Sequence, residues 1–196
     1  KTSSSGNWQE LWHSNAFGGG GSATVTALTT AGTDVYACGW FVGNVSIAGQ
    51  NFVSYTPPGS NESSQDMWVA KFDQNLNAQW ATYAGTVQND DACEDILVAP
   101  NSQDVYVIGE TNATSTSYFG TSISKNGIGG TSTDIAVGKL NAANGNWIDA
   151  NIVGSTGQDL GYSIYWRGGG MVAVGIFSGT ITFGTQQMQA IGSFDL

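Results

Sequence analysis

The stretch DMWVAKFDQNLNAQWATYAG, residues 66–85, recurs about 68 residues later as DIAVGKLNAANGNWIDANIVG, residues 134–154. In both copies an Asp opens a short apolar segment that reaches a Lys five residues on. A polar turn follows, and a Trp then opens a second segment that ends in Gly. One copy alone would predict a hairpin, whereas two copies at a fixed separation indicate an internal repeat, and the repeat decides the architecture.

Two further segments recur three times each beside this hairpin. The first alternates small polar and apolar residues, which is the pattern of a half-buried strand. Its copies are Ser22–Leu28, Asp91–Leu97 and Asp159–Tyr165. The second is a short, nearly continuous apolar run that ends in Gly, which is typical of a strand covered on both faces. Its copies are VYACG at 35–39, VYVIG at 105–109 and MVAVG at 171–175.

Each repeat therefore offers four short strands in about 61–70 residues. A single unit of this kind cannot bury both of its faces, but stacked copies can, and radial stacking leaves only short edges. We expect an all-β protein built of β-propeller blades, with about three four-stranded antiparallel repeats. The blade boundaries fall near 13–80, 81–147 and 148–196, the last joined by 1–12, within one partial propeller domain that spans 1–196.

The phase of the repeat predicts that the ring is incomplete in one chain. The sequence starts at Lys1, in the place of Lys71 and Lys139, and stops at Asp195-Leu196, at the start of the same segment. Three blades are too few for a propeller, which has about four to eight. We therefore expect self-association, or completion of the ring by the remaining blades of a longer chain.

Composition narrows the class of partner. The chain carries 5 Lys and Arg against 15 Asp and Glu, a formal net charge of −10. Binding to nucleic acid or to an anionic membrane needs a basic face, so neither is expected. No apolar run is long enough to insert into a membrane. The low Lys content and the abundance of Ser, Thr, Gly and Asn favour a secreted or cell-surface protein.

The two cysteines, Cys38 and Cys93, lie in predicted strands of neighbouring repeats. They permit one disulfide or two packed free thiols, and we favour the free thiols. Neither a CxxC motif nor a Cys/His spacing typical of a metal site is present.

Several motifs resemble the blade of the SBBP-type bacterial β-propeller repeat proteins, which are large secreted or surface proteins. That blade reads roughly VYVTGYFSGTATFG, then G-x-x-D-x-FVAKLD, GN-x-x-W and a GG turn. The matching segments are DMWVAKFD at 66–73, DVYVIGETN at 104–112, NGNWIDANIVG at 144–154 and VAVGIFSGTITFG at 172–184. The first repeat departs from it with VSIAG and the second with ETNATSTSYFG. The resemblance implies a propeller and no particular reaction.

An acidic run provides the sharpest candidate for a metal site. Asp90, Asp91, Glu94 and Asp95 place four carboxylates within six residues, and Ca²⁺ favours six to eight oxygen ligands. The run lacks the spaced pattern of a dedicated Ca²⁺ loop. Because Asp91 aligns with Asp159 and Ser22, we favour capping of a blade turn, with metal binding as the alternative. The repeated Asp66, Asp134 and Asp195 are expected to fix turns, and Trp80 and Trp147 to pack between blades.

Aromatic residues near the variable connections are the remaining candidates for a binding site. Trp40, Tyr55 and Tyr118 could grip a glycan or a surface protein, or could pack against the next blade. The lone His13 has no marked Ser partner, and no G-x-S-x-G motif occurs. We therefore expect a non-catalytic interaction or assembly module. The alternatives are a carbohydrate-binding lectin and a propeller enzyme such as a lyase or glycosidase.

Overall fold

The computed structural model describes residues 17–56, 63–85, 90–101, 103–112, 124–127, 132–183 and 185–193. Within these ranges the chain forms strands and turns and no helix, so the prediction of an all-β protein is confirmed. No helix capable of crossing a membrane is found in the described part of the chain. The expectations for Lys1, His13, Tyr118 and Asp195 concern residues outside these ranges.

The first two repeats each form a four-stranded antiparallel sheet with the same strand order. The first sheet runs β2-β3-β6-β7 and the second β8-β9-β11-β12, with the short β10 added in parallel beside β12. The strands of the first sheet are β2 (Ser22–Ala31), β3 (Asp34–Val42), β6 (Gln65–Phe72) and β7 (Ala78–Ala84). Those of the second are β8 (Asp91–Val98), β9 (Asp104–Thr111), β10 (Ser124–Gly127), β11 (Asp134–Asn141) and β12 (Trp147–Gly154).

The third repeat has a two-stranded sheet in the described residues, and residues 1–12 and 195–196, which were expected to complete it, lie outside them. It pairs β13 (Leu160–Arg167) with β14 (Gly170–Ile176). Two hairpins stand beside the sheets: β4 (Asn44–Ile47) with β5 (Gln50–Val53), joined by β1 (Phe17–Gly19), and β15 (Thr180–Phe183) with β16 (Gln186–Gln189). The described sheets do not close into a ring.

The register of the strands makes the three repeats equivalent residue by residue. The Gly that ends each apolar run lies opposite one residue of the preceding strand, and a β-bulge follows in all three. These pairs are Gly39 with Val25, Gly109 with Cys93 and Gly175 with Gly161. This register differs by one residue from the alignment of the sequences, so Ala23 rather than Ser22 occupies the place of Asp91.

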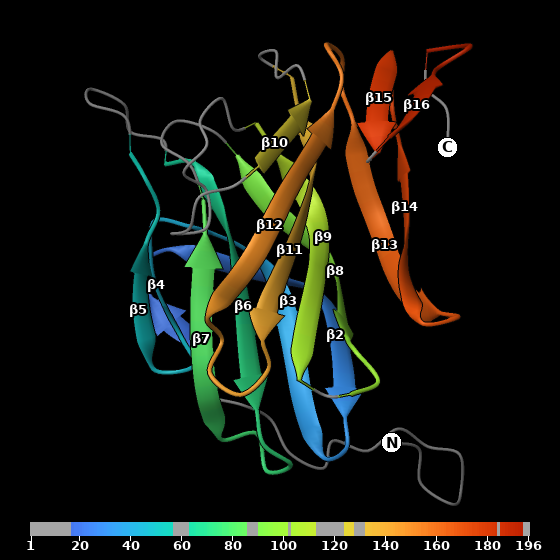
Figure 1. Ribbon diagram of the computed structural model, residues 1–196. Coiled ribbons are helices and arrows are strands. Elements are labelled where there is room, and N and C mark those ends of the chain that lie inside the picture. Colours follow the sequence, from blue (N-terminus) through green and yellow to red (C-terminus); the bar gives the residue numbers. More distant parts are fainter. Residues whose placement is uncertain are drawn as a thin grey trace, which may run out of the picture.

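The sheets stack face to face in the order of the sequence (Figure 1). We call the face that a sheet turns toward the preceding repeat its front face, and the opposite face its rear face. The rear face of the first sheet is the one that meets the second sheet, and its front face is the other. Met67, Val69 and Trp80 on the rear of the first sheet pack against Ile96 and other apolar residues on the front of the second. The rear of the second sheet meets β13 through Ile108, Ile135 and Ile164. Stacking thus buries faces that a single repeat would leave in water.

Repeated polar contacts hold the strands in place. Lys71 Nζ lies 2.8 Å from Asp34 Oδ2, and Lys139 Nζ lies 3.1 Å from Asp104 Oδ2. Each lysine also lies over a tyrosine ring of the neighbouring strand. Trp80 Nε1 donates to the carbonyl of Ala142 at 3.2 Å, which links the first sheet to the second and confirms its packing between repeats.

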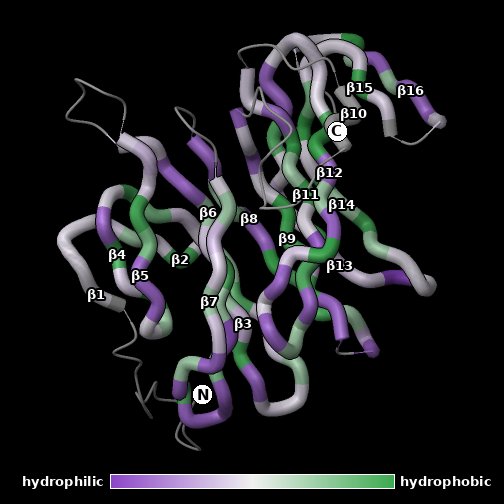
Figure 2. The backbone as a smooth tube through the Cα atoms, turned by 60° about the vertical axis from the view of Figure 1, so that its left-hand side comes forward, coloured by the Kyte–Doolittle hydropathy of each residue, from purple (hydrophilic) through white to green (hydrophobic). Residues whose placement is uncertain are grey.

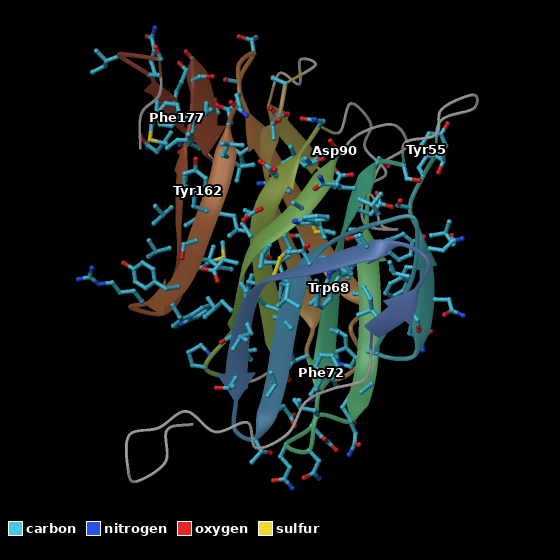
Figure 3. All side chains as sticks on the ribbon, turned by 180° about the vertical axis from the view of Figure 1, so that it is seen from behind. Tyr55, Trp68, Phe72, Asp90, Tyr162 and Phe177 are labelled. Atoms are coloured by element: carbon cyan, nitrogen blue, oxygen red, sulfur yellow. A yellow bond between two sulfur atoms is a disulfide. The ribbon has the colours of Figure 1, made fainter. Side chains whose placement is uncertain are left out.

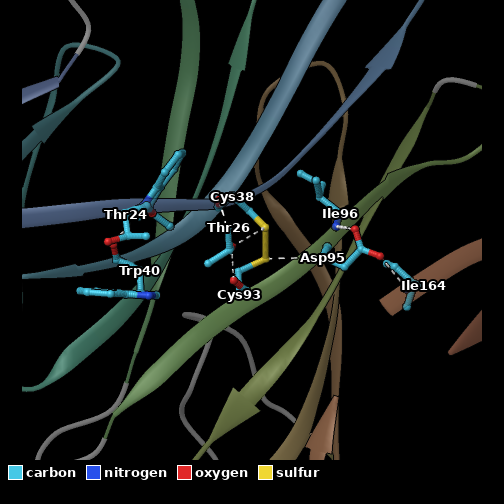
Figure 4. Close-up of a disulfide and its surroundings, with 9 residues drawn as sticks. Thr24, Thr26, Cys38, Trp40, Cys93, Asp95, Ile96 and Ile164 are labelled. Carbon is cyan, nitrogen blue, oxygen red and sulfur yellow. Dashed lines mark hydrogen bonds between the residues drawn. A yellow bond between two sulfur atoms is a disulfide. The ribbon is translucent and has the colours of Figure 1, made fainter. Parts of the chain in front are cut away.

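The cysteines correct one prediction. Cys38 on β3 and Cys93 on β8 form a disulfide, with a Cα–Cα distance of 5.9 Å, so the expectation of free thiols was wrong. Both residues are fully buried where the rear of the first sheet meets the front of the second (Figure 4). Thr26 Oγ1 donates to the carbonyls of both cysteines, which places its hydroxyl across the junction.

We expect the double variant Cys38→Ala/Cys93→Ala to fold but to unfold more readily, because the bond joins residues 55 apart in the sequence. A cross-link over a loop of that size stabilises by about 4 kcal/mol in the chain-entropy model. Thermal melting followed by circular dichroism would measure the loss. Reductant should lower the melting temperature of the native protein and leave the variant unchanged; equal sensitivity of both would contradict the assignment.

Candidate functional site

The strand β14 has one open edge among the described residues. In the first sheet β3 lies between β2 and β6, and in the second β9 lies between β8 and β11. The equivalent β14 pairs with β13 alone. An edge of this kind presents unpaired backbone N–H and C=O groups and can accept another strand.

An apolar cavity adjoins this edge, and we call it the β14 groove. It has a volume of about 250 Å³. Its lining residues come from the rear of the second sheet, from β14 and the turn after it, and from the hairpin β15–β16: Ile108, Ile135, Val137, Ala173, Val174, Gly175, Phe177, Ile181 and Met188. Figure 2 shows hydrophobic stretches of β9, β11 and β14 in green. No lining residue is titratable, so the groove suits apolar contact rather than acid–base chemistry.

The equivalent place at the preceding junction is filled by strands. There Ala136 and Leu140 of β11 and Ile152 of β12 are buried in the cluster that contains Met67 and Val69. Beside β14 no described strand occupies the position of β11, and the groove lies where that strand would pack. The open edge and the groove are therefore two aspects of one strand position that no described residue occupies.

The third repeat also lacks the polar contacts that fix this strand in the others. Lys71 lies opposite Tyr36, and Lys139 lies opposite Tyr106. The equivalent residue of β14 is Val172. Likewise Asp34 and Asp104, the ion-pair partners of the lysines, have Gly170 as their counterpart. A strand added to β14 would be held by backbone hydrogen bonds and apolar packing, without a lysine site.

The carboxylates of the acidic run, residues 90–95, point to different partners. Asp95 turns toward the third repeat, where its Oδ2 accepts from Ser163 Oγ at 2.6 Å and from the backbone N–H of Ile164 at 2.9 Å. Asp90 Oδ1 accepts from the backbone N–H of Gln65 at 2.9 Å, in the first repeat. Glu94 lies in the β-bulge, and burial raises the pKa of its carboxyl.

Asp91 is fully buried at the start of β8, and its equivalent in the third repeat is Asp159, which is also fully buried. Asp159 accepts from the backbone N–H and the hydroxyl of Ser155 and from the backbone N–H of Ser178 at 2.9 Å. It thus caps two turns of the third repeat. In the described residues no group of three or more Asp, Glu, His or Cys side chains is arranged to hold a metal ion. Calcium binding stays a prediction.

Asp66 is buried at the start of β6, and its Oδ1 has no hydrogen-bond partner. Burial, with the nearby charges of Asp91 and Asp90, raises its pKa from 3.8 to about 7. Gly85 leaves room for this carboxylate, since a Cβ there would lie 2.0 Å from Oδ1, and Asp134 stands over Gly154 in the same way. The repeated Asp thus packs on a glycine at the end of the neighbouring hairpin strand.

Two of the three predicted aromatic residues, Trp40 and Tyr55, are described, and both belong to the first repeat. Trp40 is half-buried within β3, opposite Met67. Tyr55 follows β5, and its carbonyl accepts from the backbone N–H of Ser64 at 2.8 Å. The two rings do not contact each other. Figure 3 shows Tyr55 at the same end of the molecule as Asp90, with Phe72 toward the other end.

Comparison with the known protein families and with curated proteins found no match to this chain. The β14 groove therefore stands on its geometry alone. Sequence reasoning did not find it, because its residues repeat as ordinary core positions of every blade. The available signal was the replacement of the Tyr and the Asp of the first two repeats by Val172 and Gly170 in the third.

The raised pKa of Asp66 predicts a stability that falls as pH rises. Its folded-state pKa of about 7 exceeds the ordinary 3.8, so the stabilising effect of the neutral carboxyl is complete below about pH 4 and is lost by about pH 7. The variant Asp66→Asn cannot ionise, and we expect it to gain up to about 4 kcal/mol over the native protein at pH 8, with little difference at pH 4. Urea unfolding at both pH values measures this.

Asp73 supplies a control of opposite sign. It is exposed, and hydrogen bonds from the side chain and backbone of Asn77 and the backbone of Asn75 lower its pKa. Asp73→Asn should lose a small amount of stability at neutral pH and nothing in acid. If the unfolding free energies of the two variants changed with pH in the same direction, the environment of Asp66 would not be the cause of the pH dependence.

Proposed function

We propose that the chain is a non-catalytic interaction and assembly module of a secreted or cell-surface β-propeller array. In this proposal the ring or polymer is completed at the open edge of β14, by another copy of the chain or by further repeats of a longer one. The completing element is a β-strand that fills the β14 groove.

The observation that carries this proposal is the strand position beside β14, which no strand occupies in the part of the chain that the structure describes. Two preceding repeats supply a third strand at that position, and each buries it against a neighbouring sheet. The groove is lined by apolar side chains, and addition of a strand satisfies the open backbone groups while it removes apolar surface from water. The disulfide between Cys38 and Cys93 is compatible with an oxidising compartment.

A strand peptide tests the proposal directly. The peptide TDIAVGKL, residues 133–140, reproduces β11, whose inward side chains at the preceding junction are small or aliphatic. We expect a fluorescently labelled copy to bind the purified chain saturably, as measured by fluorescence anisotropy. Ala173→Asp should weaken binding at least about tenfold, because it places a charge in the apolar groove, on the face of β14 that turns toward the second sheet.

Two controls make the result specific. Val53→Asp introduces the same charge at an exposed residue of β5, outside the groove, and should bind the peptide as the native chain does. Replacing both Ala136 and Val137 of the peptide by Pro removes an N–H from either edge of the strand and should abolish binding. If the proline peptide binds equally well, strand addition is not the mode of contact and the proposal fails.

A further inference from the structure

The front face of the first sheet carries exposed aliphatic side chains at positions that the other repeats bury. Val25 is 49% exposed and Leu28 is 67% exposed. Their equivalents in the second sheet are Cys93 and Ile96, which are buried against the first sheet. In the third repeat the same positions are Gly161 and Ile164, which meet the rear of the second sheet.

The rear face of the third sheet shows the complementary exposure. Val174 is 42% exposed, whereas the equivalent Cys38 and Ile108 of the earlier sheets are fully buried. Val174 therefore occupies a rear-face contact position on which no following sheet rests in the described residues. One chain thus presents both halves of the junction that joins its own repeats.

A single pair of positions lies at the centre of each internal junction. At the first junction the pair is Cys38 and Cys93, close enough to be bonded. At the second it is Ile108 and Gly161, where a Cβ on the glycine would lie 2.6 Å from Ile108 Cγ1. By register, the pair for a third junction is Val174 with Val25.

From these equivalences we infer that a second copy of this chain docks the front of its first sheet on the rear of the third sheet, with Val25 against Val174. This inference rests on the proposed function and adds to it the identity of the partner and the register of the contact. The contact is head-to-tail, so it generates a closed ring where the rotation allows and a filament otherwise. Two copies would stack six repeats, within the range of about four to eight blades seen in propellers.

Engineered cysteines can test this register, since they would reproduce the native cross-link at the new junction. The variant Val25→Cys/Val174→Cys places thiols at the positions of Cys93 and Cys38. Under mild oxidation we expect covalent dimers and higher species on non-reducing gels, at least about tenfold more abundant than in the control. Mass spectrometry should identify the peptide pair that joins position 25 of one copy to position 174 of another.

The matched control is Val53→Cys/Val174→Cys. Val53 is exposed on β5 but has no equivalent at the internal junctions, so its thiol should not join position 174 of another copy. Circular dichroism verifies that both variants remain β-sheet proteins. A cross-link within one chain, or equal yields from the two variants, would overturn the inference.

The peptide experiment separates the two proposals. If TDIAVGKL binds at β14 while the cysteine pair gives no bond between copies, strand completion holds and the second copy is not the partner. If neither result appears, both proposals fail. Light scattering of the native chain gives an independent check, because self-docking predicts a mass of at least twice 20.4 kDa that rises with concentration.

Discussion

Every described sheet of this protein depends on face-to-face contact with its neighbour. A repeat of two to four short strands has too little apolar surface on one side to be stable by itself, and stacking supplies the second layer. The contact is made at the same positions each time. Two of them flank the bulge in the first strand of one repeat, and the third lies beside the Gly that ends the apolar run of the preceding repeat. At one junction these positions are joined covalently through Cys38 and Cys93, and at the other they are filled by Ile108 and a glycine. Different pairs of side chains thus fill the same space between adjacent sheets.

The buried carboxylates follow from the same stacking. Strand ends at a junction leave backbone N–H groups that neither sheet can pair, and an acidic side chain can accept several of them at once. Asp159 does so within the third repeat, and Asp95 does so across the junction from the second repeat to the third. Acidic residues that look like ligands in the sequence therefore act as connections between repeats. Asp66 differs, because its carboxylate packs on Gly85 and its pKa is raised by burial.

The sequence predicted the structure best where the same residue type recurs at the start or end of a strand. The repeated Asp, Lys and Trp of residues 66–85 and 134–154 predicted the hairpins, and the apolar runs ending in Gly predicted β3, β9 and β14. What could not be predicted was the state of the cysteines, because it depends on which faces meet, and a strand pattern gives no facing partner. The bulge also escaped prediction, since Thr26, Glu94 and Tyr162 share no chemistry and are related only by register. The β14 groove depends on the neighbours of β14, and no residue of β14 itself indicates that no described strand lies there.

The differences between the repeats explain why the third is the open one. In the first two, an ion pair and a lysine over a tyrosine ring bind the third strand to the second: Lys71 with Asp34 and Tyr36, and Lys139 with Asp104 and Tyr106. Gly170 and Val172 replace the acid and the ring in the third repeat, and no described strand occupies that position. A surface without charged or aromatic contacts discriminates weakly among strands of similar shape, because backbone hydrogen bonds are the same for every sequence. Specificity for a partner must then come from the stacked faces on either side of the strand, where a Val or a Cys at one position requires a fitting neighbour at the other.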